Sequence, residues 1–316
     1  MFAYIQLAVG LILLIVGGEI LVKGAVECAL RFRISKLVVG MTVVSFGTSA
    51  PELVVSLEAA YKGFPDISMG NVIGSNIANL ALVLGLTSIV FPIAVSKNSI
   101  RFDWPVMMLV TVIFYFLILD GDLGRMEGTV LLFILITFST FLIWKSRREN
   151  SLAAIEAGDI EDSDTPLWKS ILFVLFGAGA LAFGSEWLVE GAVEVAHRFG
   201  VSDLVISVTI VAFGTSAPEL ITSLMAAFRK HADISIGNLV GSNIFNIALV
   251  LGVTGIMKPI DVSQTILNFD IYWFLAISFI ILPFMLNKRK ILRWEGALLF
   301  ISYAAYIFWV VQIGKI

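Results

Sequence analysis

The sequence predicts an all-α integral membrane protein, with ten transmembrane helices arranged as two inverted five-helix repeats. Three observations lead to this fold class. The 316 residues are 59% hydrophobic and only 14% charged, whereas a soluble domain carries about 25% charged residues. Apolar runs such as Val106–Leu119 do not alternate with polar residues, which favours helices over the strands of a membrane barrel. Finally, long blocks of the first half recur in the second.

Ten apolar runs, separated by charged or Pro/Gly-rich breaks, are candidate spans, because a helix needs about 20 apolar residues to cross a bilayer core. The N-terminal run has no basic leader and no small-residue cleavage pattern, so we expect it to be the first span. The predicted spans are 3–30, 36–61, 67–91, 104–120, 127–145, 168–197, 203–229, 234–257, 270–286 and 293–313.

A polar segment, KSRRENSLAAIEAGDIEDSDTP, lies between the fifth and sixth runs. It has no aromatic residue and no hydrophobic periodicity, so we expect a flexible linker. The predicted organisation is therefore a first repeat over 1–145, a cytoplasmic linker over 146–167 and a second, inverted repeat over 168–316.

The two halves are related by an internal duplication at an offset of 167 residues. GTSAPEL occurs at 47–53 and again at 214–220, and residues 67–85 match residues 234–252 at 14 of 19 positions. Because each half has five predicted spans, an odd number, the second copy must enter the membrane with the opposite orientation. Inverted repeats of this kind are characteristic of secondary transporters whose binding site lies near the bilayer midplane.

The positions of lysine and arginine predict the orientation in the membrane. With both termini outside, five basic residues lie outside, namely Lys62, Arg125, Arg198, Lys258 and Lys315. The remaining sixteen of the 21 basic residues then lie on the cytoplasmic side, as the positive-inside rule requires. We therefore expect external termini and a cytoplasmic linker.

The GTSAPEL motif combines a helix breaker with an acid. Pro51 has no N–H with which to bond the carbonyl of Gly47, so we expect a broken helix with freed carbonyls around Ser45–Gly47, and likewise in the second copy. Broken helices at membrane depth are tolerated only where they are buried in protein or line a wet cavity. A carboxylate in the membrane, here Glu52 and its copy Glu219, is by default a functional group.

Helical spacing gathers further oxygen atoms around the two glutamates. Hydroxyl groups lie three and four residues before each acid, and asparagine and serine residues recur every four residues in the following span. The oxygen-bearing residues are Thr48, Ser49, Thr215 and Ser216 beside the acids, and Asn71, Ser75, Asn79, Asn238, Ser242 and Asn246 in the following spans. Glycines at 70, 74, 237 and 241 make a pattern that lets helices approach closely.

An all-oxygen site of this kind suits Ca²⁺ or Na⁺, and does not suit zinc or copper. The single cysteine, Cys28, excludes a cysteine-cluster metal site. Two glutamates balance the charge of one Ca²⁺ or most of the charge of several Na⁺. Because an empty pair of buried carboxylates is costly, one ion can leave only when another ion or protons replace it, which predicts exchange.

The paired GTSAPEL and GNxxGSNIxN blocks resemble the alpha repeats of the sodium/calcium exchanger superfamily, and the resemblance covers essentially the whole chain. It implies a plasma-membrane antiporter that exports Ca²⁺ in exchange for Na⁺ by alternating access, with the first and sixth spans sliding as a gate. It implies no cofactor and no obligate protein partner. The implied ion ligands are Glu52, Glu219, Thr48, Ser49, Ser75, Asn79, Thr215, Ser216, Ser242 and Asn246, with the backbone carbonyls of Ser45 and Ala212.

One departure from the family pattern concerns the coupling ion. Well-studied members have an aspartate where this chain has Asn246, and an amide can offer an oxygen but cannot carry a proton. The alternatives are therefore a Ca²⁺/H⁺ or broader cation/H⁺ antiporter and, more remotely, a passive cation channel. An intramembrane hydrolase is disfavoured because the spans hold no Ser/His, HExxH or paired-aspartate arrangement. Glu19, which can pair with Lys23 one turn later, suits a packing or gating role.

Overall fold

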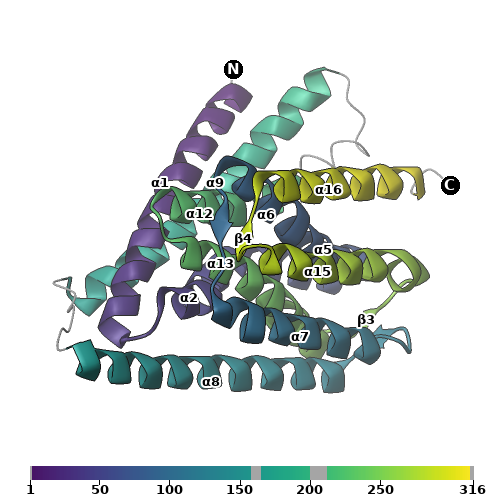
Figure 1. Cartoon of the computed structure of the whole chain (residues 1–316). Helices are drawn as coiled ribbons and strands as arrows, with labels where there is room; N and C mark the ends of the chain where they lie inside the picture. Colours follow the sequence, from purple (N-terminus) through teal and green to yellow (C-terminus); the bar gives the residue numbers. More distant parts are fainter. Residues whose placement is uncertain (1, 158–164, 200–211, 314–316) are drawn as a thin grey trace.

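The structure, a computed structural model, describes residues 2–157, 165–199 and 212–313 (Figure 1). In the first half the elements, with η denoting a π-helical segment, are α1 (Phe2–Phe32), α2 (Lys36–Val39), η1 (Gly40–Val44), α3 (Ser45–Thr48), α4 (Ala50–Tyr61), α5 (Pro65–Ile77), η2 (Ala78–Val83), α6 (Leu84–Val90), β1 (Ile93–Ala94), η3 (Ser99–Asp103), α7 (Trp104–Leu117), β2 (Asp122–Leu123) and α8 (Arg125–Ala157). In the second half they are α9 (Leu167–Arg198), α11 (Ala212–Thr215), α12 (Ala217–Phe228), α13 (Ala232–Phe245), η5 (Asn246–Leu251), α14 (Gly252–Met257), β3 (Ile260–Asp261), η6 (Ile266–Asp270), α15 (Ile271–Leu286), β4 (Lys290–Ile291) and α16 (Arg293–Ile313).

Apolar helices of membrane-spanning length dominate the described residues, and they confirm the prediction of a helical membrane fold. In the described part of the chain, eight helices are long and apolar enough to cross a bilayer, and the bent pair Lys36–Thr48 and Ala50–Tyr61 makes a ninth if the two helices form one span. The start of the predicted span at 203–229 lies outside the described residues, and α12 is a shorter apolar helix. The count of ten spans therefore stays a prediction.

The segment that follows the fifth span is helical where the sequence predicted a flexible linker. Helix α8 continues without a break to Ala157, so the prediction is wrong for residues 146–157. Two local features explain the extension. Lys145 and Glu149 lie one turn apart with a nitrogen–oxygen distance of 4.0 Å, and the following SLAAIEA stretch consists mostly of good helix formers.

Both proline motifs break their helices, as predicted. Ser49 separates α3 from α4, and the helical segment Lys36–Thr48 meets Ala50–Tyr61 at an angle of 43°. Ser216 separates α11 from α12 in the same way, with φ and ψ of −92° and 2° that leave the helical region. Pro51 and Pro218 then occupy the first turn of the new helix, where a missing N–H costs nothing. Each glutamate thereby comes to lie in the first turn of a helix.

Two short antiparallel strand pairs join the halves. Strand β1 pairs with β4, with Ile93 opposite Ile291, and β2 pairs with β3, with Leu123 opposite Ile260. Because the span formed by η3 and α7 lies between β1 and β2 in the chain, the two strand pairs lie at opposite ends of that span. Figure 1 shows β4 and β3 correspondingly far apart along α7 and α15.

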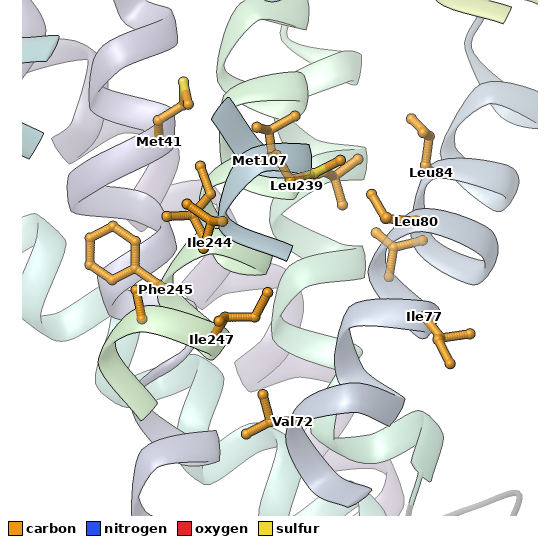
Figure 2. Packing of buried hydrophobic residues seen from close by; sticks show 14 of the residues in the cluster. Met41, Val72, Ile77, Leu80, Leu84, Met107, Leu239, Ile244, Phe245 and Ile247 are labelled. Atoms are coloured by element: carbon orange, nitrogen blue, oxygen red, sulfur yellow. The ribbon is translucent and has the colours of Figure 1, made fainter. Parts of the chain in front are cut away.

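The two spans that carry the asparagine motifs form the centre of the protein. In an apolar 18-residue stretch of Pro65–Val90, and in one of Ala232–Met257, 83% is buried. In the corresponding stretches of the other long helices, 22–39% is buried. Buried apolar side chains from both halves and from α7 pack into one cluster, in which Figure 2 shows Met107 beside Leu239. The polar motifs of these central spans are thus buried in the interior, where an unpaired polar group is costly.

Candidate cation-binding site

Two fully buried glutamates form the core of the site. Glu52 lies in the first turn of α4 and Glu219 in the first turn of α12, and both are 0% exposed. The two carboxyl groups are close enough to interact electrostatically. None of their four oxygen atoms has a hydrogen-bond partner within the part of the chain that the structure describes. The positive end of each helix dipole favours negative charge there, but two adjacent unpaired carboxylates are costly unless a cation or protons neutralise them.

Serine residues at the helix breaks add one oxygen atom from each half. Ser49 and Ser216 lie three residues before the two glutamates and are almost completely buried. Neither hydroxyl has a hydrogen-bond partner among the described residues. Buried polar groups in proteins nearly always have a hydrogen-bond partner. These two oxygen atoms are therefore available to a ligand that is not part of the protein.

The asparagine-bearing spans supply a second set of unpartnered oxygen atoms. Asn79 lies in η2 and Asn246 is the first residue of η5, where the helix widens to a π-helical turn, a distortion that is frequent at functional sites. Both asparagines are 0% exposed, and no described residue bonds either of their amide groups. The hydroxyl of Ser75 is buried as well, and no described residue forms a hydrogen bond with it. Helix α4 packs against η5 and α12 against η2, so each glutamate faces the asparagine segment of the other half.

Hydrogen bonds between the halves engage three other predicted ligands. The Thr48 hydroxyl lies 3.2 Å from Asn238 Oδ1 and 3.3 Å from Ser242 Oγ. The Ser45 hydroxyl donates to the backbone carbonyl of Asn238 at 3.1 Å. Thr48 is also near enough to Glu219 to interact with its carboxyl group. These bonds bring the proline motif of the first half into contact with the central span of the second.

The carbonyl of Ser45 is not free of intrahelical partners, so that expectation is wrong. It accepts a hydrogen bond from the backbone N–H of Ser49 at 2.9 Å, because Ser49 still closes the last turn of α3. A carbonyl has two lone pairs, so its role as an ion ligand stays a prediction. Ala212 begins α11 and its side chain lies outside the described part, whereas Thr215 ends the same helix and is half-buried.

Two asparagines of the same motif tie helices together. Asn71 donates to Ser56 Oγ at 2.9 Å and to the carbonyl of Glu52 at 3.2 Å. Its repeat equivalent Asn238 donates to Ser223 Oγ at 3.2 Å. These residues therefore hold each glutamate-bearing helix against the span that follows it.

Replacing Asn71 with leucine tests this structural role. Because hydrogen bonds between membrane helices contribute about 0.6 kcal/mol on average and up to about 1.7 kcal/mol, we expect a loss of unfolding free energy in that range. Cation selectivity should be unchanged. Thermal unfolding in detergent and competition among cations measure the two quantities, and altered selectivity at unchanged stability would contradict the assignment.

Sequence reasoning missed a pair of residues at the contact between the halves. The Nδ2 of Asn76 donates to the carbonyl of its repeat equivalent Asn243 at 3.3 Å, and the side-chain oxygen of each is buried without a partner among the described residues. Both residues belong to the GSNI block that occurs once in each half, and this repetition could have identified them as candidates from the sequence. Glu19 forms an ion pair with Arg229, next to α12, and not with Lys23.

The arrangement can bind a hard cation. Two carboxylates, two hydroxyl groups at the helix breaks and two central amides are buried, come from both halves and have no hydrogen-bond partner among the described residues. No group of three or more His, Cys, Asp or Glu in those residues could hold a metal ion, so neutral oxygen atoms must complete the coordination. Oxygen-only sites are those of Ca²⁺ and similar hard ions. Fold and site together define an α-helical membrane protein with a central, buried cluster of oxygen atoms whose chemistry suits a hard cation.

Comparisons with known proteins agree with this class. The family model described as sodium/calcium exchanger protein matches residues 2–144 and 169–312. The inner membrane protein YrbG of Escherichia coli is 33% identical, over 96% of each chain, and the sodium/calcium exchanger MaX1 of Methanosarcina acetivorans is 29% identical, over 96% of this chain and 97% of its own. A solved structure of the sodium–calcium exchanger NCX_Mj, soaked with zero Na⁺ and Ca²⁺, has a TM-score of 0.83, an identity of 32% and coverage of 98% of this chain and 99% of its own.

This chain belongs to the sodium/calcium exchanger protein family. It is a multi-pass membrane antiporter of the cation/calcium class, and its relatives are transporters and not enzymes.

Proposed function

We propose that this protein exports Ca²⁺ across the plasma membrane in exchange for Na⁺ by alternating access. The observation that carries the proposal is the pair of fully buried glutamates whose four oxygen atoms have no hydrogen-bond partner among the described residues. Such a pair balances the charge of one Ca²⁺, or most of the charge of several Na⁺. Because the empty site is electrostatically unfavourable, release of one ion is coupled to binding of its replacement.

The strand pairs support an inverted relation between the repeats. The strands β1 and β3 occupy equivalent places, 167 residues apart, yet β1 pairs with β4 while β3 pairs with β2. Since β1 and β2 lie at opposite ends of the same span, β1 and β3 do too. Equivalent parts of the two halves at opposite membrane faces are what an inverted repeat requires, and such repeats bind ions between the halves. The excess of basic residues supports external termini and a cytoplasmic linker.

Counterflow in reconstituted vesicles tests the coupling ion. Purified protein in Ca²⁺-loaded proteoliposomes is exposed to an inward gradient of Na⁺, K⁺ or H⁺, one at a time. We expect Ca²⁺ efflux with the Na⁺ gradient only. Efflux driven by a proton gradient alone, with no effect of Na⁺, would instead establish a cation/H⁺ antiporter, and conductance far above transporter turnover would establish a channel.

The substitution Asn246→Asp tests whether this side chain faces the ions. An added acid in the site can bind a proton that competes with Ca²⁺, so we expect Ca²⁺ transport by the variant to fall more steeply as pH is lowered than transport by the wild type. The Ca²⁺ flux between about pH 5.5 and pH 8, near the range in which perturbed buried carboxyl groups titrate, measures the difference. An unchanged pH profile would place Asn246 outside the ion path.

A further inference from the structure

One hydrogen bond connects a long peripheral helix to the broken helix of the second half. Pro218 has no N–H, so the carbonyl of Gly214, four residues earlier, has no intrahelical donor. The hydroxyl of Ser185 on α9 donates to that carbonyl at 2.5 Å. Ser185 is 7% exposed and Gly214 is buried. A side chain of α9 thus replaces the backbone donor that the proline removed.

Among the described residues, the first half has no equivalent of this bond. At the repeat offset of 167 residues, Ser185 corresponds to Gly18 on α1, and Gly214 corresponds to Gly47. Glycine has no hydroxyl, and the three heavy atoms nearest to a Cβ added at Gly47 belong to the apolar side chains of Ala178 and Leu21. The two otherwise similar halves therefore differ at the helix break beside the glutamate. In the second half a hydroxyl of α9 donates to the freed carbonyl, and in the first half the equivalent residue of α1 has no hydroxyl.

Helix α9 is packed so closely on α1 that the two are expected to move together. A Cβ added at Gly177 would lie 2.6 Å from the backbone nitrogen of Leu21, and one added at Gly191 would lie 2.7 Å from the carbonyl of Ala3. Figure 1 shows the two long helices crossing the molecule side by side. Sliding of this pair past the site breaks the Ser185–Gly214 bond, leaving a buried carbonyl and a buried hydroxyl unsatisfied.

We propose that Ser185 is a positioning residue that holds α9 against the ion site in one of the two access states. The hydroxyl acts through Gly214 on the segment that presents Ser216 and Glu219, and it does not touch the ion. Because the first half lacks the bond, the energies of the inward- and outward-facing states are unequal. This inference rests on the proposed exchange by alternating access.

The test measures the Michaelis constant for Ca²⁺ at each face of the membrane in right-side-out proteoliposomes. Na⁺-driven uptake gives the constant at the outer face, and Na⁺-driven efflux gives the constant at the inner face. Loss of a partner for a buried polar group shifts an equilibrium by about tenfold. For Ser185→Ala we expect the constant to rise at one face and to fall at the other, so that their ratio changes by about tenfold. A defect of folding alone lowers the maximal rate without this opposite movement.

Two conservative variants and one control complete the experiment. Ser185→Thr keeps the hydroxyl and should keep the wild-type ratio, whereas Ser185→Cys keeps the volume but offers only a weak donor and should follow the alanine variant. Ser170→Ala removes a buried hydroxyl of α9 that has no partner among the described residues, and should leave the ratio unchanged. An unchanged ratio in Ser185→Ala and Ser185→Cys overturns the inference alone. Absence of Na⁺-driven Ca²⁺ flux in the wild type overturns the proposed function together with it.

Discussion

Replacing either Glu52 or Glu219 with glutamine is expected to lower the affinity for Ca²⁺ by about two orders of magnitude or more and to abolish Ca²⁺ flux. Both side chains are completely buried, and they are the two charges of the site. Calcium affinity in oxygen sites varies over several orders of magnitude with the number of ligand charges. Glutamine keeps the shape and one oxygen atom of glutamate but removes the charge, so the measured loss reports charge balance and not packing.

Stability measurements separate this loss from misfolding. The metal-free variants should unfold at the wild-type temperature or above it, because one unpaired buried charge is gone. They should lose the stabilisation that Ca²⁺ gives the wild type, about 2.7 kcal/mol at a hundred times the dissociation constant. Glu58→Gln is the matched control, since this acid lies on the same helix and pairs with Lys62 at the surface. Near-normal flux in either site variant would overturn the site assignment.

The broken helices could be predicted because their cause is local. A proline inside an apolar run removes one N–H, and the structure accordingly breaks the helices before Pro51 and Pro218. The acid that follows each proline must then begin a new helix. A place for this acid inside the protein could be predicted too, because it lies within an apolar run long enough to span a membrane.

The hydrogen-bond partners could not be predicted, because they depend on contacts between distant segments. Thr48 and Ser49 are adjacent hydroxyl residues, yet Thr48 bonds to the other half while Ser49 has no partner among the described residues. Glu19 was expected to pair with Lys23 one turn away, but the packing of α1 beside α12 brings Arg229 closer. Spacing along one helix fixes which residues share a face, and only the packing of helices decides what that face meets.

The substitution Gly237→Ala is expected to destabilise the protein strongly, because this glycine allows α13 to touch the α2–η1 segment. A Cβ at position 237 would lie 2.5 Å from the carbonyl of Leu37 and 3.1 Å from the nitrogen of Met41, and one at Gly40 would lie 2.8 Å from the carbonyl of Ile234. All of these are backbone atoms, which cannot rotate away as a side chain can. Such overpacking costs about 1–3 kcal/mol or more, although alanine in a helix is otherwise favoured over glycine by about 1 kcal/mol.

This contact also aligns the ion site, so the loss of stability should be accompanied by a loss of transport. Displacing α13 from the first half separates Thr48 from Ser242, which lie 3.3 Å apart across the same interface. We expect a fall in unfolding temperature of about 2–12 °C, at about 2–4 °C per kcal/mol for a chain of 150–250 residues or somewhat more, and reduced Ca²⁺ flux in the variant that still folds. The control is Gly179→Ala on α9, where no heavy atom of the described chain lies within 4 Å of the added Cβ. Equal unfolding temperatures for the two variants would show that the halves do not depend on this backbone contact, and the arrangement of the site would then need another explanation.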